Sequence, residues 1–266
     1  MPSAPHTDTG APRSDASLDA LRRRIAVLER FSGAGSAAAA KAVLLGVPAI
    51  DEHLPWGGLP RGALHEITYS AGGGPAAAGF AAALLGRLAQ TDRHTVVWCR
   101  RPAHGFRPGL YGTGLTRLGL DPDRLILAQA PDSLATLWCM EECLRSRAVA
   151  AVLGEPEQAD ARARRRLQLA AEDTGVTALL LLGDRAASMP GTAVTRWRIG
   201  AAPGRGAARW RVELVKCRGG GRPGDWTLEW RHDDDDDPDN KQNGEPAGGF
   251  RVVSPLCDGP AARRAG

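Results

Sequence analysis

The sequence predicts an α/β fold with a central, mostly parallel sheet and an antiparallel extension at one edge. Short apolar runs alternate with segments of helical periodicity between residues 62 and 183, which is the pattern of parallel strands joined by helices. Two of these runs, 95–99 (TVVWC) and 148–154 (AVAAVLG), are apolar throughout, as expected for strands covered on both faces. After residue 190 the helical pattern stops, and three segments alternate polar with apolar residues.

Length and composition are those of a soluble globular protein. The 266 residues suffice for one large domain with tails, and 43% are hydrophobic and 24% charged. We expect a cytoplasmic protein without membrane contact, since no signal-peptide pattern or membrane-length apolar run occurs. The net charge of +4 is uneven, because residues 231–266 hold eight acidic and five basic side chains. A basic body is compatible with nucleic acid or an acidic partner, and equally with a surface that binds neither.

Residues 1–40 are predicted to be disordered except for one helix. The first 16 are polar, small and proline-containing, and 32–40 (SGAGSAAAA) has the composition of a linker. Residues 17–31 predict a short helix, because four apolar residues recur at helical spacing. These are Leu18, Leu21, Ile25 and Leu28. A narrow stripe of this kind is typical of a docking helix, which packs either on its own domain or on a partner.

The main domain is predicted to span residues 41–231. Its first strand covers 62–69 and leads through a glycine turn into a helix at 75–90. Further strands are expected at 95–99, 124–130, 148–154 and 176–183. The helix at 132–147 is expected to turn one side inward, formed by Leu134, Leu137, Trp138, Glu141 and Leu144. The next helix has a stripe of small residues, formed by Ala159, Ala163, Leu167 and Ala170.

The end of the chain is predicted to contain an antiparallel extension and then a tail. The extension comprises the segments at 192–202, 209–220 and 226–232, which have no helix between them. Residues 232–266 include five consecutive aspartates and several breakers, so they are expected to form a disordered, acidic, solvated tail.

The stretch HEITYSAGGGPAAAGFAAALLGRL (65–88) has the layout of a phosphate-binding loop. A Walker A loop, G-x-x-x-x-G-K-S/T, combines glycine N–H groups, a lysine that neutralises phosphate charge and a hydroxyl that holds magnesium. The glycines are present as Gly72, Gly73 and Gly74. Pro75 stands at the lysine position and lacks an N–H, and Ala76 stands at the hydroxyl position. A plain glycine turn would explain the loop equally well.

The residues ahead of this loop resemble the RecA family. In AIDEHLPWGGLPRGALHEI (49–67), an apolar-aspartate start and the turn GGLPRG precede a strand ending in HEI, as in that family. The order of predicted strands and helices agrees with the family to about residue 217. The resemblance implies a RecA-like core with a degenerate phosphate loop.

The RecA resemblance also implies where catalytic residues should lie. The family's catalytic glutamate aligns with Arg101, and its acidic Walker B residue aligns with Gly154, one position before Glu155. Together with Pro75 and Ala76, four catalytic positions are altered. We therefore predict a protein that is not an enzyme and uses no cofactor.

More narrowly, the chain resembles the ImuA family, with its LRRRIAVLER-type helix, its degenerate loop and its RWRVELVKCRGG ending. This resemblance implies a non-catalytic accessory factor in SOS-induced, error-prone translesion DNA synthesis and the DNA damage response. The implied partners are ImuB, RecA and the error-prone replicative DNA polymerase. Alternatives are a weak or unconventional ATPase, a single-stranded-DNA-binding protein of the RecA type, and a SulA-like cell-division inhibitor.

Two groups of arginines are candidate contacts for single-stranded DNA or a partner. The first comprises Arg162, Arg164, Arg165 and Arg166. The second includes Arg209 and Arg211, which are interleaved with Trp197, Trp210 and Trp226, a mixture that suits phosphate contacts and base stacking. Alternatively, the tryptophans are the inward half of alternating edge strands and the arginines the outward half.

The five cysteines indicate reduced thiols rather than a disulfide framework, since their number is odd and no C-x-x-C pair occurs. Cys139 and Cys143 are one helical turn apart and could share a metal ion. No second ligand pair with the spacing of a zinc site follows, so the sequence predicts no metal site.

Overall fold

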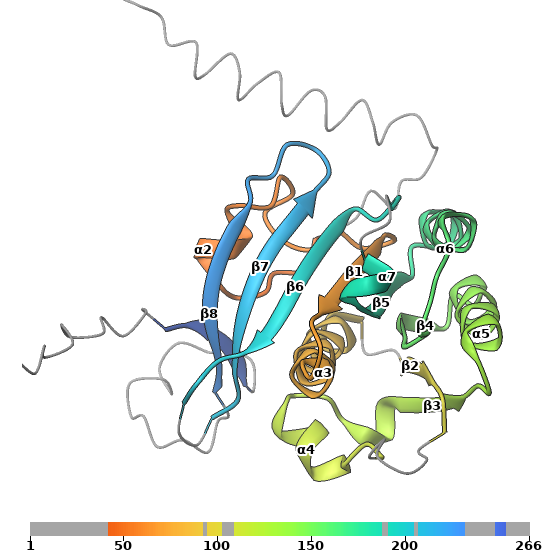
Figure 1. The fold of residues 1–266 in the computed structure, drawn as a ribbon, viewed down its shortest axis with the longest axis horizontal. Helices are drawn as coiled ribbons and strands as arrows, with labels where there is room; N and C mark the ends of the chain where they lie inside the picture. Colours follow the sequence, from red (N-terminus) through yellow and green to blue (C-terminus); the bar gives the residue numbers. More distant parts are fainter. Residues whose placement is uncertain are drawn as a thin grey trace, which may run out of the picture. The chain divides into compact units, whose positions relative to one another are not determined.

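The computed structural model describes residues 42–92, 95–102, 109–187, 191–204, 207–231 and 248–253. These residues form one nine-stranded sheet with helices packed against it (Figure 1). The strands are β1 (Leu64–Tyr69), β2 (Thr95–Arg100), β3 (Leu125–Gln129), β4 (Val149–Gly154), β5 (Thr177–Gly183), β6 (Thr195–Ala201), β7 (Arg209–Cys217), β8 (Gly224–Arg231) and β9 (Gly249–Val252). The helices are α2 (Pro48–Asp51), α3 (Gly74–Asp92), α4 (Gly112–Arg117), α5 (Ser133–Arg145), α6 (Ala161–Thr174) and α7 (Asp184–Ala187), with a 3-10 turn at Pro122–Arg124.

The strand order is β3-β2-β4-β5-β1-β6-β7-β8-β9. All pairs from β3 to β6 are parallel, and the pairs from β6 to β9 are antiparallel. This confirms the predicted α/β class, the mostly parallel sheet and the antiparallel edge. One detail of the prediction is wrong: β6 is parallel to β1, so the antiparallel extension begins with β7. The predicted docking helix at 17–31 lies outside the described residues.

Two hydrophobic clusters fill the two faces of the sheet. The cluster that contains Phe80 lies on the side of α3, and the cluster that contains Leu137 lies on the side of α5 and α6 (Figure 1). Successive residues of a strand point to opposite faces. Accordingly β1 directs Ile67 to the α3 side and Leu64 to the α6 side. The same alternation decides below which residues can reach a common site.

The turn at 57–62 (GGLPRG) has glycines for structural reasons. A Cβ on Gly58 would lie 2.7 Å from the carbonyl oxygen of Val43, and Gly62 has a φ of +60°, which favours glycine. Val43 and Leu59 exchange backbone hydrogen bonds of 2.8 Å across the turn. Packing within this chain therefore explains the glycines of the GGLPRG turn, the motif that resembles the RecA family.

Asp51, the aspartate of the AID start, stabilises the loop before α2. Its carboxylate accepts hydrogen bonds from the backbone N–H groups of Leu45 (2.9 Å), Gly46 (3.1 Å) and Val47 (3.2 Å). Burial raises the pKa of Asp51, and these three hydrogen bonds oppose the shift because they stabilise the charged form.

The strand β9 is a correction, since it lies within residues 232–266, which the sequence predicts to be disordered. Phe250 of β9 is buried, and its ring centroid lies 4.9 to 5.8 Å from those of Phe80, Trp210 and Trp230. The burial of one aromatic residue against three others stabilises this strand. The aspartate-rich composition around it concealed that signal. The rest of the predicted tail lies outside the described residues.

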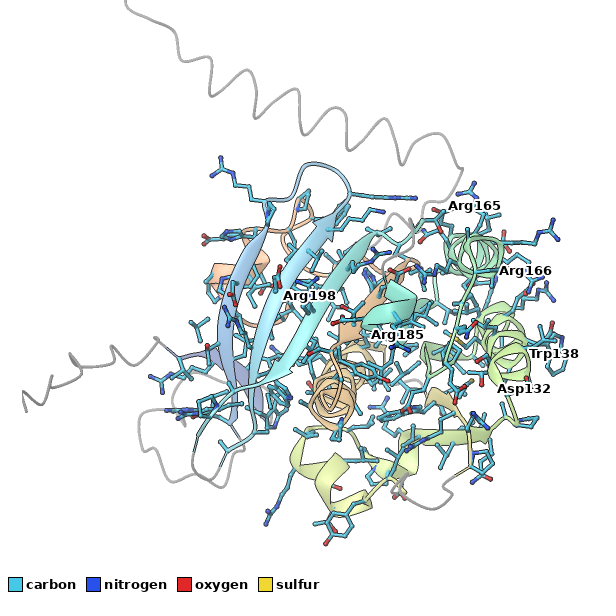
Figure 2. The ribbon with its side chains drawn as sticks, viewed as in Figure 1. Asp132, Trp138, Arg165, Arg166, Arg185 and Arg198 are labelled. Atoms are coloured by element: carbon cyan, nitrogen blue, oxygen red, sulfur yellow. The ribbon has the colours of Figure 1, made fainter. Side chains whose placement is uncertain are left out.

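The buried face of α5 also differs from the prediction. Leu134 and Trp138, expected to point inward, are 72% and 63% exposed, whereas Leu137, Met140 and Leu144 are buried. Figure 2 shows Trp138 directed away from the sheet. Among the described residues, no helix is long and apolar enough to cross a membrane.

Candidate nucleotide-type site

The glycine loop between β1 and α3 is a closed turn. The N–H of Gly73 donates a hydrogen bond to the carbonyl oxygen of Ser70 (2.8 Å), and Gly72 has a φ of +81°. This is a four-residue turn with glycine at the position that requires a positive φ. A phosphate loop uses such N–H groups to bind the ligand. Here the N–H of Gly73 is used within the turn, and Pro75 has none to offer.

Tyr69, the last residue of β1, packs against two of the glycines. A Cβ on Gly73 would lie 3.3 Å from Cβ of Tyr69 and 3.1 Å from the carbonyl oxygen of Ser70. A Cβ on Gly74 would touch the Tyr69 ring at 3.4 Å. Close packing against Ser70 and Tyr69 therefore explains Gly73 without any phosphate, whereas a Cβ at position 74 would make an ordinary van der Waals contact.

A cavity of about 640 Å³ lies beside this turn, where the parallel strands end. The first turns of α3, beginning with Gly74 and Pro75, form one wall, and Leu115 of α4 and Leu118 just after that helix also line the cavity. The remaining lining includes Trp98 and residues at the ends of the strands. The walls formed by α3 and α4 carry no charged side chain, and the charged residues that line the cavity are Arg100, Glu155 and Glu157.

The polar part of the cavity is centred on Glu155. Its carboxylate accepts a hydrogen bond from the indole N–H of Trp98 (2.7 Å) and lies 3.8 Å from Nε of Arg100. The side chains of Arg100 and Glu155 are 13% and 18% exposed. The negative charge of Glu155 is thus already balanced by an arginine, which weakens it as a ligand for Mg²⁺.

The Walker B alignment needs a correction of one residue. A Cβ on Gly154 would lie 2.1 Å from Sδ of Met140, which is on α5, so this position faces away from the cavity. The next residue, Glu155, reaches the cavity instead. An acidic group is therefore present at this end of β4, although the sequence predicts that it is lost.

The same offset applies at the end of β2. Arg100 lines the cavity, whereas Arg101 pairs with Glu157 and is 38% exposed. The alignment with the catalytic glutamate falls on Arg101, but the neighbouring Arg100 occupies the site. Sequence analysis missed Trp98, Arg100 and Glu155 as a group. Counting alternate residues along β2 from the buried Trp98 would have identified Arg100, since strand positions two apart share a face.

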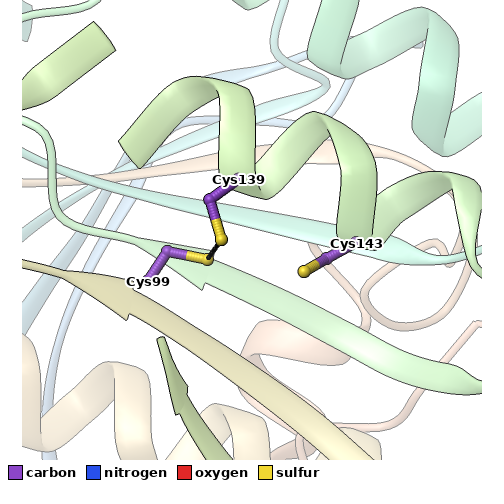
Figure 3. A group of neighbouring side chains, drawn as sticks. All are labelled: Cys99, Cys139 and Cys143. Carbon is purple, nitrogen blue, oxygen red and sulfur yellow. Dashed lines mark hydrogen bonds between the residues drawn. The ribbon is translucent and has the colours of Figure 1, made fainter. Parts of the chain in front are cut away.

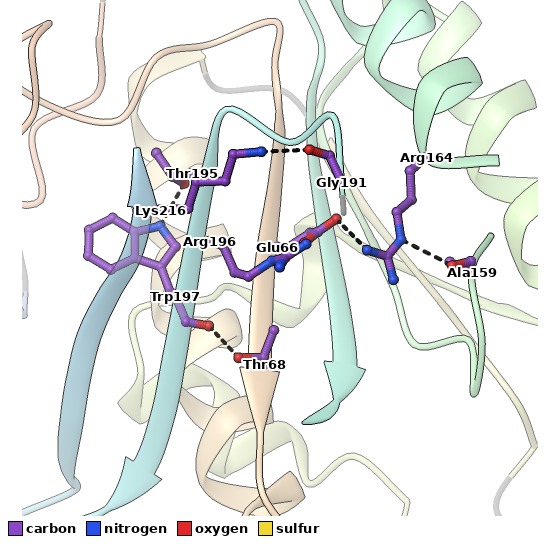
Figure 4. Close-up of polar contacts among 9 residues, drawn as sticks. All are labelled: Glu66, Thr68, Ala159, Arg164, Gly191, Thr195, Arg196, Trp197 and Lys216. Carbon is purple, nitrogen blue, oxygen red and sulfur yellow. Dashed lines mark hydrogen bonds and ion pairs between the residues drawn. The ribbon is translucent and has the colours of Figure 1, made fainter. Parts of the chain in front are cut away.

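Arg164 is buried and is therefore not a DNA contact. Its guanidinium lies 3.3 Å from one carboxylate oxygen of Glu66, and both side chains are fully buried (Figure 4). Its Nε donates to the carbonyl oxygen of Ala159 (3.1 Å), and Arg196 donates to the other oxygen of Glu66 (2.6 Å). The prediction grouped Arg164 with its neighbours because they are adjacent in sequence, but helix geometry turns Ala163 and Arg164 inward.

The other arginines of α6 are exposed. Figure 2 shows Arg165 and Arg166 directed outward, and Arg162 is exposed as well. Nε of Arg166 lies 3.0 Å from a carboxylate oxygen of Glu141 on α5. Arg162 and Arg165 therefore remain candidate contacts for an anionic partner.

The arginines and tryptophans of β6 to β8 separate onto two faces. Trp197 and Trp210 are buried. Arg209 pairs with Glu229, and Arg211 lies 2.7 Å from Asp225 across the strands. Trp226 is half-buried and makes an edge-to-face contact with His53 at 5.1 Å. The alternative interpretation is thus confirmed for Trp197 and Trp210, which are inside and cannot stack on bases.

Comparison with known proteins finds two close relatives. Protein ImuA of Caulobacter vibrioides strain NA1000 / CB15N is 38% identical to this chain over 246 residues, which cover 85% of this chain and 94% of the relative. Protein ImuA of Caulobacter vibrioides strain ATCC 19089 / CIP 103742 / CB 15 matches to the same extent. No protein-family model matches the chain.

Proposed function

This chain belongs to the ImuA family, and we propose that it is a non-catalytic, RecA-like accessory factor in SOS-induced, error-prone translesion DNA synthesis. In this proposal it bridges ImuB, RecA and the error-prone replicative polymerase in the cytoplasm. The observation that carries the proposal is the closed glycine turn, which is followed in α3 by Pro75 and Ala76 in place of the lysine and the hydroxyl residue. The ImuA relatives favour this role over that of a SulA-like inhibitor.

Three features of the loop and the adjoining cavity argue against ATP hydrolysis. The lost lysine removes a charge-assisted contact worth about 1.5 to 3 kcal/mol in binding, and transition-state stabilisation of phosphoryl transfer depends on such charges. The N–H of Gly73 is engaged with Ser70. The carboxylate of Glu155 is held by Trp98 and Arg100. A retained RecA-like fold without this chemistry is suited to protein–protein contact.

Exposed apolar side chains support a role as a binding scaffold. Ile126 and Leu127 on the edge strand β3 are 54% and 42% exposed, and Leu134 and Trp138 on α5 are exposed further along the chain. Large apolar side chains in water often mark interaction sites, and an unpaired strand edge can accept another chain. We propose that these residues and the predicted helix at 17–31 contact the partners.

The test has an enzymatic and a binding part. Calorimetric titration with magnesium-ATP and a phosphate-release assay should show neither micromolar binding nor turnover. Purified ImuB and RecA should be captured by the full-length protein, and Leu134→Ala with Trp138→Ala should reduce capture about tenfold or more, given the weight of buried tryptophans at interfaces. Leu169→Ala on α6, 46% exposed, is the matched control. ATP turnover, or capture that depends equally on Leu169, contradicts the proposal.

A weak ATPase is a second candidate because Glu155 reaches the cavity beside the glycine turn. This alternative predicts slow phosphate release that Glu155→Gln abolishes. Glu157→Gln is the control, since Glu157 pairs with Arg101 at the outer edge of the site. If the unmodified protein releases no phosphate, this candidate is excluded.

Direct binding of single-stranded DNA is proposed only for the outer face of α6. Arg162 and Arg165 are exposed there. Binding through them should fall steeply with salt, as expected for phosphate contacts. The double variant Arg162→Ala with Arg165→Ala should reduce both the affinity and its salt dependence in a fluorescence anisotropy titration. The control is Arg209→Ala. Because Arg209 pairs with Glu229, this variant should leave the affinity and its salt dependence unchanged.

A further inference from the structure

Three cysteines from two elements converge on the α5 side of the sheet, on the opposite face from the cavity. Cys99 lies on β2, and Cys139 and Cys143 lie one turn apart on α5 (Figure 3). Their sulfur atoms all lie within 4.8 Å of one another, and the thiol of Cys99 donates to Sγ of Cys139 at 3.4 Å. We propose that this cluster binds a thiophilic d10 metal ion, such as Zn²⁺ or Cu⁺.

The sulfur separations fit a single ion. Thiolates bind Zn²⁺ at about 2.3 Å, which places the sulfurs of a trigonal or tetrahedral site about 3.8 to 4.0 Å apart. The sulfurs of Cys99 and Cys139 are 3.4 Å apart and no separation in the cluster exceeds 4.8 Å, so all three lie within about 1 Å of these values. Because residues four apart in a helix share one face, Cys139 and Cys143 are both presented toward β2. Small side-chain rotations would bring all three sulfurs to one ion.

The ligand set selects the kind of ion. Within the described part of the chain, the cluster contains three cysteines and no histidine or carboxylate. Ligands that are all sulfur favour soft ions over Mg²⁺ or Ca²⁺. Three protein ligands leave the fourth position of a tetrahedral ion open to water.

The surroundings allow both access and stabilisation. Cys99 is buried, whereas Cys139 and Cys143 are half-buried, so an ion can enter from the α5 surface. The neighbouring buried side chains, such as Leu137 and Leu144, are apolar. A bound ion would connect β2 to α5, the helix that exposes Leu134 and Trp138. Since an ion that binds only the folded chain stabilises it, the melting temperature should rise with metal.

The experiment uses the full chain with Cys217→Ser and Cys257→Ser, which leaves only the three clustered thiols. The reduced, chelator-treated protein is titrated with Cd²⁺, which reports thiolate binding through a charge-transfer absorption band. Zn²⁺ and, under anaerobic reducing conditions, Cu⁺ are then added as competitors. We expect one Cd²⁺ per chain, displaced by Zn²⁺ or Cu⁺. Each bound thiolate releases a proton, so the affinity should rise with pH.

Single substitutions decide the outcome. Cys143→Ser and Cys139→Ser change half-buried ligands. Each should weaken Cd²⁺ binding roughly tenfold or more, since even changes to residues that only support the ligands have effects of this size. Each should also remove the metal-dependent rise in melting temperature. If Cys99→Ser does not fold, as judged by circular dichroism, these two variants still decide. Cd²⁺ binding that is absent, or unchanged in both variants, overturns the proposal. The proposal is also overturned if Cys99 and Cys139 form a disulfide in protein whose free thiols are alkylated at the moment of cell lysis.

Discussion

The two faces of the sheet each hold a carboxylate paired with arginine, but the two sites differ in burial and in consequence. On the α6 face, Glu66 is fully buried between Arg164 and Arg196 (Figure 4). On the α3 face, Glu155 and Arg100 are partly open at the wall of a cavity. An arginine beside a carboxylate can thus be either a buried structural element or a partly exposed pair that lines a cavity. The Glu66 and Glu155 pairs differ in how deeply they are buried.

Burial shifts the pKa values of two of the cations around Glu66. Burial lowers the pKa of Arg164, and the Glu66 carboxylate opposes that shift. Burial likewise lowers the pKa of Lys216, whose Nζ donates to the carbonyl oxygen of Gly191 at 2.6 Å. Two arginines therefore share the Glu66 carboxylate, which also opposes the pKa shift of Lys216. This group fixes β1 to α6 and β6, and its loss should be far more damaging than any change at the cavity.

The largest expected effect is that of Glu66→Gln. The substitution leaves Arg164 and Arg196 without their carboxylate, and an uncompensated buried charge destabilises by about 3 to 5 kcal/mol. Glu155→Gln, at the partly open pair, should cost only about 1 kcal/mol. Urea denaturation measures both. Equal losses in the two variants would mean that the difference in burial between the sites has no energetic consequence.

Gly154→Asp tests the assignment of the two faces. A carboxylate there would enter the apolar α5 side, where Sδ of Met140 occupies the position of the added Cβ. We expect a loss of about 3 kcal/mol or more from burial of an unpaired acid. Glu155→Asp is the matched control and should leave stability within about 1 kcal/mol. An aspartate at 154 that is tolerated and supports ATP turnover would restore the original Walker B alignment.

His65 precedes Glu66 in β1 and lies on the other face of the strand. Its contribution to stability can be tested by varying the pH. It is fully buried and hydrogen-bonds to Thr195 Oγ1 (2.8 Å) and the carbonyl oxygen of Pro60 (2.9 Å). Burial lowers the pKa of His65 to about 4, below an unfolded value of about 6.5. The folded state therefore keeps the ring neutral, and its stability is full above pH 6.5 and is lost as the pH falls toward 4.

The expected size of this loss is about 3 kcal/mol, from the difference between the two pKa values. Unfolding free energies measured between pH 7 and pH 4.5 should fall more steeply in the unmodified protein than in His65→Gln. His53→Gln, which changes a half-buried histidine, should keep the steep dependence. If His65→Gln and the unmodified protein show parallel pH profiles, His65 is not the group that titrates.

The smallest effect is expected for Pro75→Lys combined with Ala76→Thr. These changes restore the side chains of a Walker A loop, but the N–H of Gly73 stays bonded to Ser70. We expect no ATP turnover and a change in stability below about 1 kcal/mol, because loss of the proline acts mainly on the unfolded chain. Phosphate release and thermal melting provide the measurements. Turnover in this variant would contradict the expectation that the shape of the turn prevents ATP hydrolysis.

Local patterns in the sequence were sufficient for much of the fold. The apolar runs at 95–99 and 148–154 predict β2 and β4 within a residue or two, because a strand covered on both faces must be apolar throughout. The missing lysine and hydroxyl residue at Pro75 and Ala76 can likewise be recognised without coordinates. Alternation along β6 and β7 allowed the tryptophans to be interpreted as inward residues.

The candidate sites depended on information that the sequence does not carry locally. Gly154 and Glu155 differ by one position, yet one faces Met140 and the other faces the cavity. Arg164 is buried and Arg165 exposed for the same kind of reason. Cys99 joins Cys139 and Cys143 only because α5 packs across β2.

The sequence by itself determined the fold class, most of the helices and strands, and the loss of the Walker A side chains. The tertiary structure alone decided which charges are buried, which residues line the cavity and which thiols meet. The physical reason is that periodicity is a property of one element, whereas the face that an element buries is set by the elements packed against it. At Glu66 those partners lie about a hundred residues or more away in the chain.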